Sequence, residues 1–289
     1  MLLTPLAAVA DERLPAYLLQ LPQSITDVFV ADAGSAALHR YSNSPDGIRL
    51  AGTSYMSIGE NGVGKRREWD RRTPLGIYFV VDRLDTSRMH EKYGVVAFPL
   101  DYPNVRDRQA ARSGNGIWVH GVDPQGGRRP EYDTDGCLAV PNEDLSRLAG
   151  AFRPAATPVI ITANLRRVDA ADRERIVAEL REAMAAWAHA LAAPDPDAYL
   201  AYYADDFRYR GLERDEWELL RRERFAGRGA AEVAMGDLML LAEPEEPGVY
   251  LARFRLRTAA NGASIETVKR LYWRRDGAGY LRIVAEDNG

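Results

Sequence analysis

The chain has 289 residues with 38 basic and 42 acidic side chains, giving a formal net charge of −4. Hydrophobic residues make up 46% and charged residues 28%, which is typical of globular domains and excludes disordered and fibrous classes. No apolar run approaches the roughly 20 residues of a membrane-spanning helix, so we expect no membrane span. The chain also lacks the block of basic residues that is typical of nucleic-acid-binding proteins, so we expect no nucleic-acid partner.

The first predicted unit is an N-terminal segment, residues 1–25. It opens on a short apolar stretch that ends in Ala8-Val9-Ala10, a small-x-small pattern typical of signal-peptide cleavage sites. No basic leader precedes the stretch, so two interpretations stay open at this point. The segment is the end of a secretory signal, or it is a frayed apolar terminus.

Residues 26–165 are predicted to form a mostly β domain. Short apolar or alternating runs are separated by Gly-rich and Asn-Ser-Pro-Asp-Gly turn sequences. The strands expected from these runs cover 28–30, 37–41, 48–56, 77–81, 117–119, 137–140 and 158–162.

Residues 166–289 are predicted to form a smaller α+β domain. Apolar residues recur at helical spacing from 169 to 192, and further helices are expected from 197 to 204 and from 214 to 225. Long alternating strands follow, and Asp276-Gly277-Ala278-Gly279 predicts a hairpin turn. Six aromatic residues either form the core of this domain or line a ligand pocket: Trp187, Tyr199, Tyr202, Tyr203, Trp217 and Tyr272.

The chemistry of the chain is concentrated between residues 116 and 145. Cys137 is the single cysteine, which excludes an internal disulfide and a zinc site built from several thiolates. A predicted strand delivers His120, and Cys137 begins another strand 17 residues later, so neighbouring strands would bring imidazole and thiol together. Because a nearby base activates a thiol, we expect Cys137 to be a nucleophile and His120 its general base in acyl transfer. Backbone N–H groups at Gly136 and Cys137 would hold the oxyanion.

Two other classes of function are weighed against acyl transfer. A metal-dependent hydrolase would use His120 with Asp123, Asp133 or Asp135, but the sequence offers no second nearby histidine and no zinc-motif spacing. A non-catalytic cell-wall-binding scaffold would leave Cys137 as a buried core residue. We therefore expect no metal site and no cofactor.

The motifs around this segment resemble those of the L,D-transpeptidase (YkuD-like) catalytic domain. The resemblance rests on His120-Gly121, on Thr134-Asp135-Gly136-Cys137-Leu138 and on Val140, Asn142 and Asp144-Leu145. Upstream, Gly64-Lys65, the run from Trp69 to Tyr78 and the run from Ala97 to Asn104 are also similar to family segments. The resemblance covers about residues 26–162, and it implies a β-sandwich or barrel fold.

The resemblance implies a reaction on peptidoglycan stem peptides in the periplasm. Cys137 would attack the carbonyl of meso-diaminopimelate in a tetrapeptide stem, and the terminal D-alanine would leave. The Gly121 carbonyl would orient His120. An amine acceptor would make the protein a transpeptidase; water would make it an L,D-carboxypeptidase or a hydrolase that detaches lipoprotein.

The resemblance also implies candidate substrate-binding residues, namely Lys65, Arg72, Tyr102, Thr134, Asp135 and Asn142. Many family members carry Arg two residues after the cysteine, where this chain has Ala139, so Arg72, Lys65 or Arg128 would have to replace that charge. The second domain resembles nuclear-transport-factor-2-like cones, which implies a small ligand or a protein as its partner. Two-domain relatives of this kind include enzymes that influence cell shape.

Overall fold

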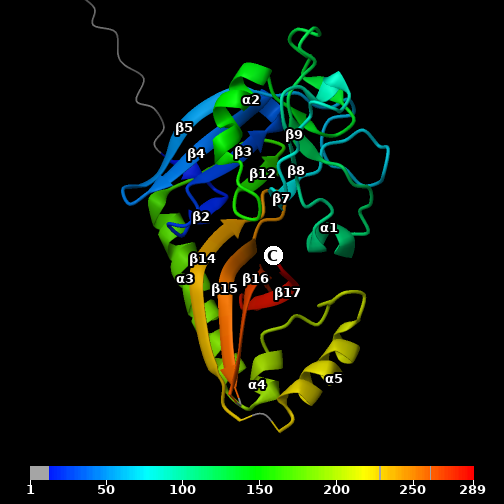
Figure 1. Ribbon diagram of the computed structural model, residues 1–289. Helices are drawn as coiled ribbons and strands as arrows, with labels where there is room; N and C mark the ends of the chain where they lie inside the picture. The colour runs from blue at the N-terminus through cyan, green and yellow to red at the C-terminus, as the bar shows by residue number, and fades with distance from the viewer. Residues whose placement is uncertain (1–12, 228, 261) are drawn as a thin grey trace, which may run out of the picture.

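The computed structural model describes residues 13–227, 229–260 and 262–289. Two domains lie one above the other, and the C-terminus lies where they meet (Figure 1). The predicted cleavage motif at Ala8–Ala10 lies outside the described residues. Within the described residues, no helix has the length and apolar character needed to cross a membrane.

The first domain is built on a five-stranded sheet with the order β5-β4-β3-β12-β7. Its strands are β3 (Asp27–Asp32), β4 (Ala37–Ser44), β5 (Gly47–Tyr55), β7 (Gly76–Phe79) and β12 (Pro158–Thr162). β12 runs parallel to β3 and antiparallel to β7. Every residue of β3, β12 and β7 is buried, which explains their nearly continuous apolar sequences.

Two smaller sheets face this layer and carry the catalytic segment. One has the order β11-β9-β8, and the other pairs β10 with β6. The strands are β6 (Ile58–Gly59), β8 (Ala97–Pro99), β9 (Trp118–His120), β10 (Tyr132–Thr134) and β11 (Leu138–Ala139). The helices are η1 (Ala33–Ser35), η2 (Glu91–Tyr93), α1 (Val105–Gln109), α2 (Asn142–Leu148) and η3 (Ala149–Ala151).

One aromatic stack joins the large sheet to the smaller ones. The ring of Phe152 lies 3.9 Å from that of Phe29 in β3 and 4.6 Å from that of Phe98 in β8, centroid to centroid. The surrounding core includes Val119 of β9 and Leu138 of β11. Packing of this density leaves side chains little freedom to shift, so the core fixes the two strands that bear the predicted catalytic residues.

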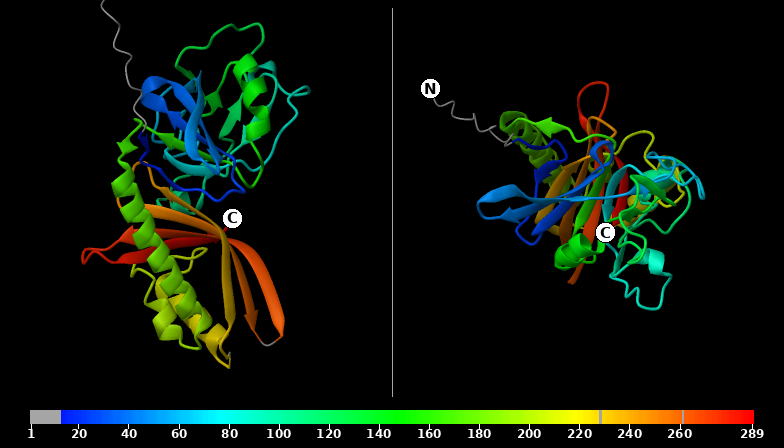
Figure 2. Two further views of the ribbon diagram at one scale, coloured as in Figure 1. Left: turned by 90° about the vertical axis from the view of Figure 1, so that its left-hand side faces the viewer. Right: turned by 90° about the horizontal axis from the view of Figure 1, so that it is seen from above.

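The second domain is a curved antiparallel sheet covered by helices, as the sequence predicts. The helices are α3 (Ala170–Ala192), α4 (Pro196–Leu200) and α5 (Arg214–Phe225). The long strands are β14 (Glu232–Ala242), β15 (Val249–Ala260), β16 (Ala263–Arg275) and β17 (Leu281–Asn288). Figure 2 shows α3 running along the sheet. Along β15, Arg255 and Arg257 are more exposed than Phe254 and Leu256, as period-two alternation requires.

The aromatic residues of the second domain form its core. Trp217 lies 4.4 Å from Tyr203 and 6.5 Å from Tyr199 between ring centroids, and Trp187 lies 6.2 Å from Tyr199. Tyr272 is fully buried, and half-buried Tyr202 packs against the same core. Of the two alternatives for this set, the structure therefore favours a packed core over the lining of a pocket.

The described N-terminal residues pair with strands of the second domain and of the interdomain connection, although residues 1–25 are predicted to be a separate segment. Strand β2 (Leu18–Gln20) pairs with β14 at the edge of the second sheet, and β1 (Leu14–Pro15) pairs with β13 (Arg167–Val168) at the interdomain connection. Leu18 and Leu19 are buried there. This pairing depends on residues far apart in sequence, which a local pattern does not reveal.

Candidate active site

The predicted nucleophile and base lie at the ends of two adjacent strands. β11 runs parallel to β9, with Leu138 opposite Val119 and Ala139 opposite His120. Cys137 directly precedes β11, so it lies beside the β9 residue Trp118. The two chain segments that the sequence predicts to be neighbours are therefore neighbours in the sheet.

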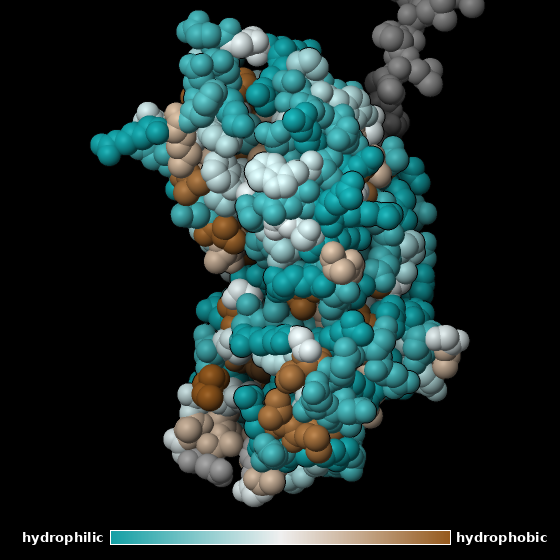
Figure 3. Space-filling model, turned by 90° about the vertical axis from the view of Figure 1, so that its right-hand side faces the viewer, coloured by the Kyte–Doolittle hydropathy of each residue, from teal (hydrophilic) through white to brown (hydrophobic). Residues whose placement is uncertain are grey.

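His120 and Cys137 both line a pocket of about 590 Å³ on the first domain. Its remaining lining residues come from the loops around the small sheets: Glu60, Lys65, Glu68, Trp69, Arg71, Lys92, Tyr93, Gly114, Asn115, Gly116, Trp118, Arg129, Asp133, Thr134 and Asp135. Figure 3 shows one side of the molecule, which is mainly hydrophilic with apolar patches on both domains. Most residues that line the pocket are polar or charged, which suits a polar substrate.

The imidazole of His120 is held in one orientation. Its Nδ1 lies 2.6 Å from the carbonyl oxygen of Gly121, and because a carbonyl only accepts, Nδ1 carries the proton and Nε2 is left to accept one. The Tyr93 ring packs edge-on, 5.3 Å away between centroids. Burial lowers the pKa of His120 to about 4, so the ring is neutral at physiological pH.

The thiol of Cys137 is also neutral. The residue is 9% exposed, and its Sγ donates to the carbonyl of Gly116 at 3.3 Å. Burial raises the thiol pKa to about 11, although the backbone amide of Trp118 opposes that shift. A neutral thiol and a neutral imidazole that line one pocket suit proton transfer during nucleophilic attack, rather than a preformed thiolate–imidazolium pair.

The backbone before the cysteine is fixed by two threonines. Thr134 Oγ1 accepts from the Gly136 N–H at 3.0 Å and donates to the Cys137 carbonyl at 2.8 Å. Thr73 Oγ1 donates to the Gly136 carbonyl at 3.0 Å. Gly136 has φ of +124°, and a Cβ there would lie 2.7 Å from the carbonyl oxygen of Arg72, so only glycine fits.

These bonds correct one expectation about the oxyanion site. The Gly136 N–H is not free to bind an oxyanion, because the hydroxyl of Thr134 already accepts from it. Of the two backbone donors predicted from the sequence, Cys137 N is left for that role. The sequence shows a glycine at the required place but not the side chain that occupies its amide.

Three of the six candidate substrate-binding residues lie in the pocket. Lys65 is 4% exposed, and its Nζ donates to Asp70 Oδ1 at 2.8 Å. Asp135 pairs with Lys92 at 3.5 Å, and Thr134 makes the backbone contacts described above. Lys65 and Asp135 thus set the charge of the pocket, but both already have protein partners.

The other three candidates lie away from the pocket. Arg72 Nη1 donates to the carbonyl of Val63 at 3.0 Å, so its charge is directed away from the thiol. Tyr102 belongs to the core, and its hydroxyl donates to the Ser113 carbonyl at 3.0 Å. The expectation that these two bind substrate is corrected, because sequence proximity to a motif did not place their side chains in the cleft.

Asn142 does not line the pocket, contrary to the prediction that it binds substrate. At the start of α2, its Oδ1 accepts from Val122 N at 3.0 Å and its Nδ2 donates to Val122 O at 2.7 Å. A Cβ on Gly121 would lie 2.2 Å from the same Oδ1. Asn142 therefore holds the loop that carries the Gly121 carbonyl, instead of lining the pocket.

Of the residues weighed for other roles, Asp133 lines the pocket, whereas Asp123 and Arg128 do not. Asp133 lies 3.4 Å from Arg129, and Asp123 Oδ1 accepts from Gln125 N at 2.8 Å in a turn. The Arg128 guanidinium stacks on the Tyr55 ring at 4.0 Å. Ala139 is 1% exposed and bonded through its backbone to Ser57, so this position offers no room for a solvated charge.

Several pocket residues were not predicted as site residues from the sequence: Trp118, Tyr93, Lys92, Arg129 and Arg71. Trp118 stands two residues before His120, and strand alternation could have placed it on the same face. Trp69 is 85% exposed at the pocket rim with φ of +63°, an uncommon backbone conformation for a non-glycine residue. The Asp70 carboxylate fixes that loop by accepting from the amides of Arg66 and Arg67.

Comparison with known families and structures agrees with this two-domain arrangement. Residues 37–161 match the L,D-transpeptidase catalytic domain (YkuD) model, and residues 179–287 match the Cds6 C-terminal NTF2-like domain model. No curated protein matches the sequence significantly.

Two solved structures share the whole fold. The structure of Bdellovibrio bacteriovorus Bd1075 is 23% identical, with a TM-score of 0.80 over 96% of this chain and 98% of that chain. The helical cell shape determining protein Pgp2 from Campylobacter jejuni is 22% identical, with a TM-score of 0.79 over 96% of each chain. At this level of sequence identity, the similarity shows a shared fold alone.

Proposed function

From the premise that this chain joins an L,D-transpeptidase catalytic (YkuD) domain to a Cds6 C-terminal NTF2-like domain, we propose that it is a peptidoglycan-modifying cysteine acyltransferase. Its substrate is the tetrapeptide stem, and its site of action is the periplasm. The observation that carries the proposal is one pocket lined by both Cys137 and His120, with His120 Nδ1 bonded to the Gly121 carbonyl.

The first half-reaction uses the neutral pair. His120 Nε2 takes the thiol proton while Cys137 Sγ forms a bond to the carbonyl carbon of the third stem residue. The Cys137 N–H stabilises the oxyanion, and the Gly121 carbonyl stabilises the imidazolium through Nδ1. When the tetrahedral intermediate collapses, the imidazolium returns the proton to the terminal D-alanine amine, which leaves and yields a thioester.

The second half-reaction returns the enzyme to its starting state. An amine of a second stem attacks the thioester, His120 takes its proton, and the regenerated thiolate is reprotonated. This gives a 3–3 cross-link. The fold shared with Pgp2, named as a helical cell shape determining protein, supports a role in cell shape.

Incubation with purified disaccharide-tetrapeptide, followed by mass spectrometry of the products, tests the proposal. Cross-linked dimers support a transpeptidase, tripeptide alone supports the carboxypeptidase alternative, and release only from lipoprotein-linked muropeptides supports the detaching hydrolase. Cys137→Ala should abolish every product while leaving the circular dichroism spectrum unchanged.

Absence of product together with no meropenem adduct on Cys137 would contradict the catalytic proposal. That combined result favours the wall-binding scaffold. Loss of activity with a chelator but not with thiol reagents would instead revive a metal-dependent reaction.

A further inference from the structure

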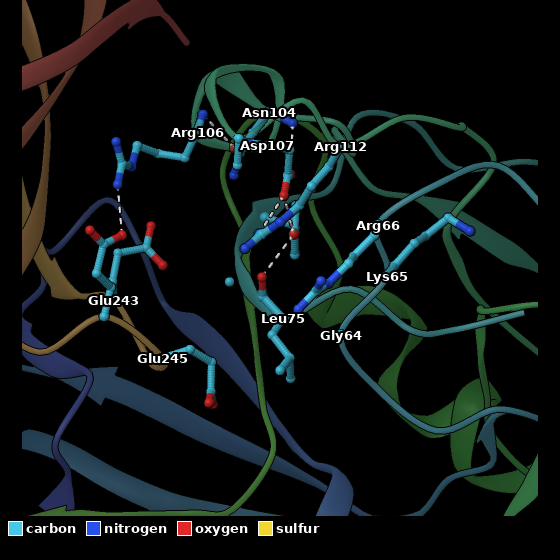
Figure 4. Close-up of a pocket in the computed structure, with 14 residues that line it drawn as sticks. Gly64, Lys65, Arg66, Leu75, Asn104, Arg106, Asp107, Arg112, Glu243 and Glu245 are labelled. Atoms are coloured by element: carbon cyan, nitrogen blue, oxygen red, sulfur yellow. Dashed lines mark hydrogen bonds and ion pairs between the residues drawn. The ribbon is translucent and has the colours of Figure 1, made fainter. Parts of the chain in front are cut away.

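A second pocket of about 420 Å³ lies at the junction of the two domains. From the first domain it is lined by the loop at Gly64–Arg66, by Leu75–Gly76 and by α1 with the residues after it. From the second domain it is lined by the turn between β14 and β15, which carries Glu243, Glu245 and Glu246. Figure 4 shows the acidic side chains on one side of this junction pocket and Arg66 on the other.

Most charges around the junction pocket already have protein partners. Arg106 Nη2 lies 2.6 Å from Glu246 Oε2, and Arg112 Nη1 lies 3.0 Å from Asp107 Oδ1. Glu245 Oε1 accepts at 3.1 Å from both the Thr162 hydroxyl and the Ala163 amide. The two ion pairs neutralise their own charges, and Glu245, although it keeps its charge, is held by the hydroxyl and the amide.

Glu243 is the exception among the acidic residues. It is 9% exposed, lines the pocket, and its carboxyl makes no hydrogen bond or ion pair within the described part of the chain. A mostly buried carboxyl that lines a pocket and has no protein partner offers an acceptor to a ligand that bears a donor.

The surroundings of Glu243 explain its protonation state. Burial raises its pKa to about 8, and the nearby carboxylates Glu246 and Asp107 add to that shift, while Arg106 and Arg112 oppose it. The hydroxyls of Tyr78 and Tyr272 are also close enough to interact with it. The carboxyl is therefore mostly protonated at neutral pH unless a cation occupies the pocket.

Arg66 supplies the complementary charge. Its side chain is exposed and lines the pocket, and its guanidinium has no partner among residues 13–227, 229–260 and 262–289. Figure 4 shows the Lys65 side chain, by contrast, directed away from the acidic residues, and its Nζ donates to Asp70. The carboxyl of Glu243 and the guanidinium of Arg66, which have no partner in the described residues, therefore line a cavity large enough for a small molecule.

We propose that the junction pocket binds a small free amino acid, with its ammonium group on the Glu243 carboxylate and its carboxylate on Arg66. The ammonium pairs with the Glu243 carboxyl, which has no partner in the described part of the chain, and the guanidinium binds the opposite end in a charge-assisted hydrogen bond. Binding ionises Glu243, so the complex releases a proton. The inference concerns binding alone and does not depend on turnover at Cys137.

Isothermal titration of the full chain carrying Cys137→Ala tests this proposal, with D-alanine as the ligand and, as comparisons, putrescine, which carries only positive charge, and acetate, which carries only negative charge. We expect D-alanine to bind more tightly than either comparison. Titration at pH 7 in buffers of different ionisation enthalpy should show proton release. Glu243→Gln should weaken binding at least about tenfold and abolish the proton release.

Matched variants separate this site from general charge effects. Glu232→Gln makes the same change at an exposed position on the same strand, β14, and should leave affinity unchanged. Arg66→Ala should weaken D-alanine binding but not putrescine binding. The proposal is overturned if D-alanine does not bind to a protein shown to be folded, if Glu243→Gln binds it equally well, or if acetate binds as tightly.

Discussion

At the scale of single residues, the active-site pair is defined by burial. The same desolvation that lowers the pKa of His120 to about 4 raises that of Cys137 to about 11. Both groups therefore stay uncharged over a broad pH range, which is the state from which the proposed reaction starts. The imidazole orientation is fixed before substrate arrives, because the Gly121 carbonyl is bonded to Nδ1.

This protonation state predicts how the free thiol reacts with iodoacetamide. Only the thiolate is alkylated, so the rate at Cys137 should rise about tenfold for each pH unit through the neutral range, without a plateau below about pH 9. The measurement is the alkylation rate followed by intact-protein mass, with glutathione as the reference thiol. A plateau near pH 6 would show a preformed ion pair and contradict this interpretation.

Gly136 predicts a second residue-level effect. A methyl group at this position would clash with the Arg72 carbonyl and would force a side chain into a φ of +124°. Gly136→Ala should therefore lower the free energy of unfolding by about 1–3 kcal/mol and stop acyl-enzyme formation. Gly150→Ala is the matched control, since nothing lies within 4 Å of its Cβ position. Equal acylation of both variants by meropenem would refute the claim.

At the scale of elements, the active site depends on the connection between β9 and α2. The chain leaves β9 at His120, turns at Gly121 and is fastened to the start of α2 by the two hydrogen bonds between Asn142 and Val122. The helix thus positions the carbonyl that orients the imidazole, although it contributes no atom to the pocket.

Loss of this connection should affect the rate of catalysis more than substrate binding. We expect Asn142→Ala to lower kcat about tenfold or more with little change in KM, and to destabilise the fold by about 1–2 kcal/mol. Steady-state kinetics on the tetrapeptide substrate measures both constants. Ser146→Ala, on the exposed face of the same helix, should behave as the unmodified protein. A change confined to KM would argue against a positioning role.

At the scale of the whole molecule, the two domains share a hydrophobic core. Val28, Val30 and Phe79 of the first sheet pack in one cluster with Leu251 and Tyr272 of the second. Strand β2 extends the second sheet from the N-terminal side of the first domain. The domains should therefore unfold in one transition, unlike domains joined by a flexible linker.

A buried ion pair across the interface gives a quantitative test. Arg270 Nη1 lies 2.5 Å from Asp101 Oδ2, and Asp101 also accepts from the Phe79 amide at 2.7 Å. Arg270→Ala leaves that carboxylate buried without its cation and should reduce the unfolding free energy by about 3 kcal/mol. Arg274→Ala breaks a more exposed pair on the same strand and should cost less than about 1 kcal/mol. Urea denaturation measures the loss of unfolding free energy in each variant. Similar losses in the two variants would contradict an interface role for Arg270.

The sequence by itself determined the order of elements and the two segments on which the proposed site rests. Alternation predicted β3, β4, β5, β7 and β12, helical spacing predicted α3 and α5, and the motif residues predicted that the segments of His120 and Cys137 are neighbours, as β9 and β11 are. These features are local, or they repeat at a fixed spacing, and backbone geometry converts such spacing directly into a face or a strand end.

Only the tertiary structure decided which side chains reach the pocket and which amides remain free. Arg72 and Tyr102 stand within or near family motifs, yet their side chains bond elsewhere, and Thr134 occupies the Gly136 amide. The junction pocket likewise brings Arg66 and Glu243 together across 177 residues of chain. Contacts of this kind depend on how distant segments pack, and no periodicity in the sequence encodes that packing.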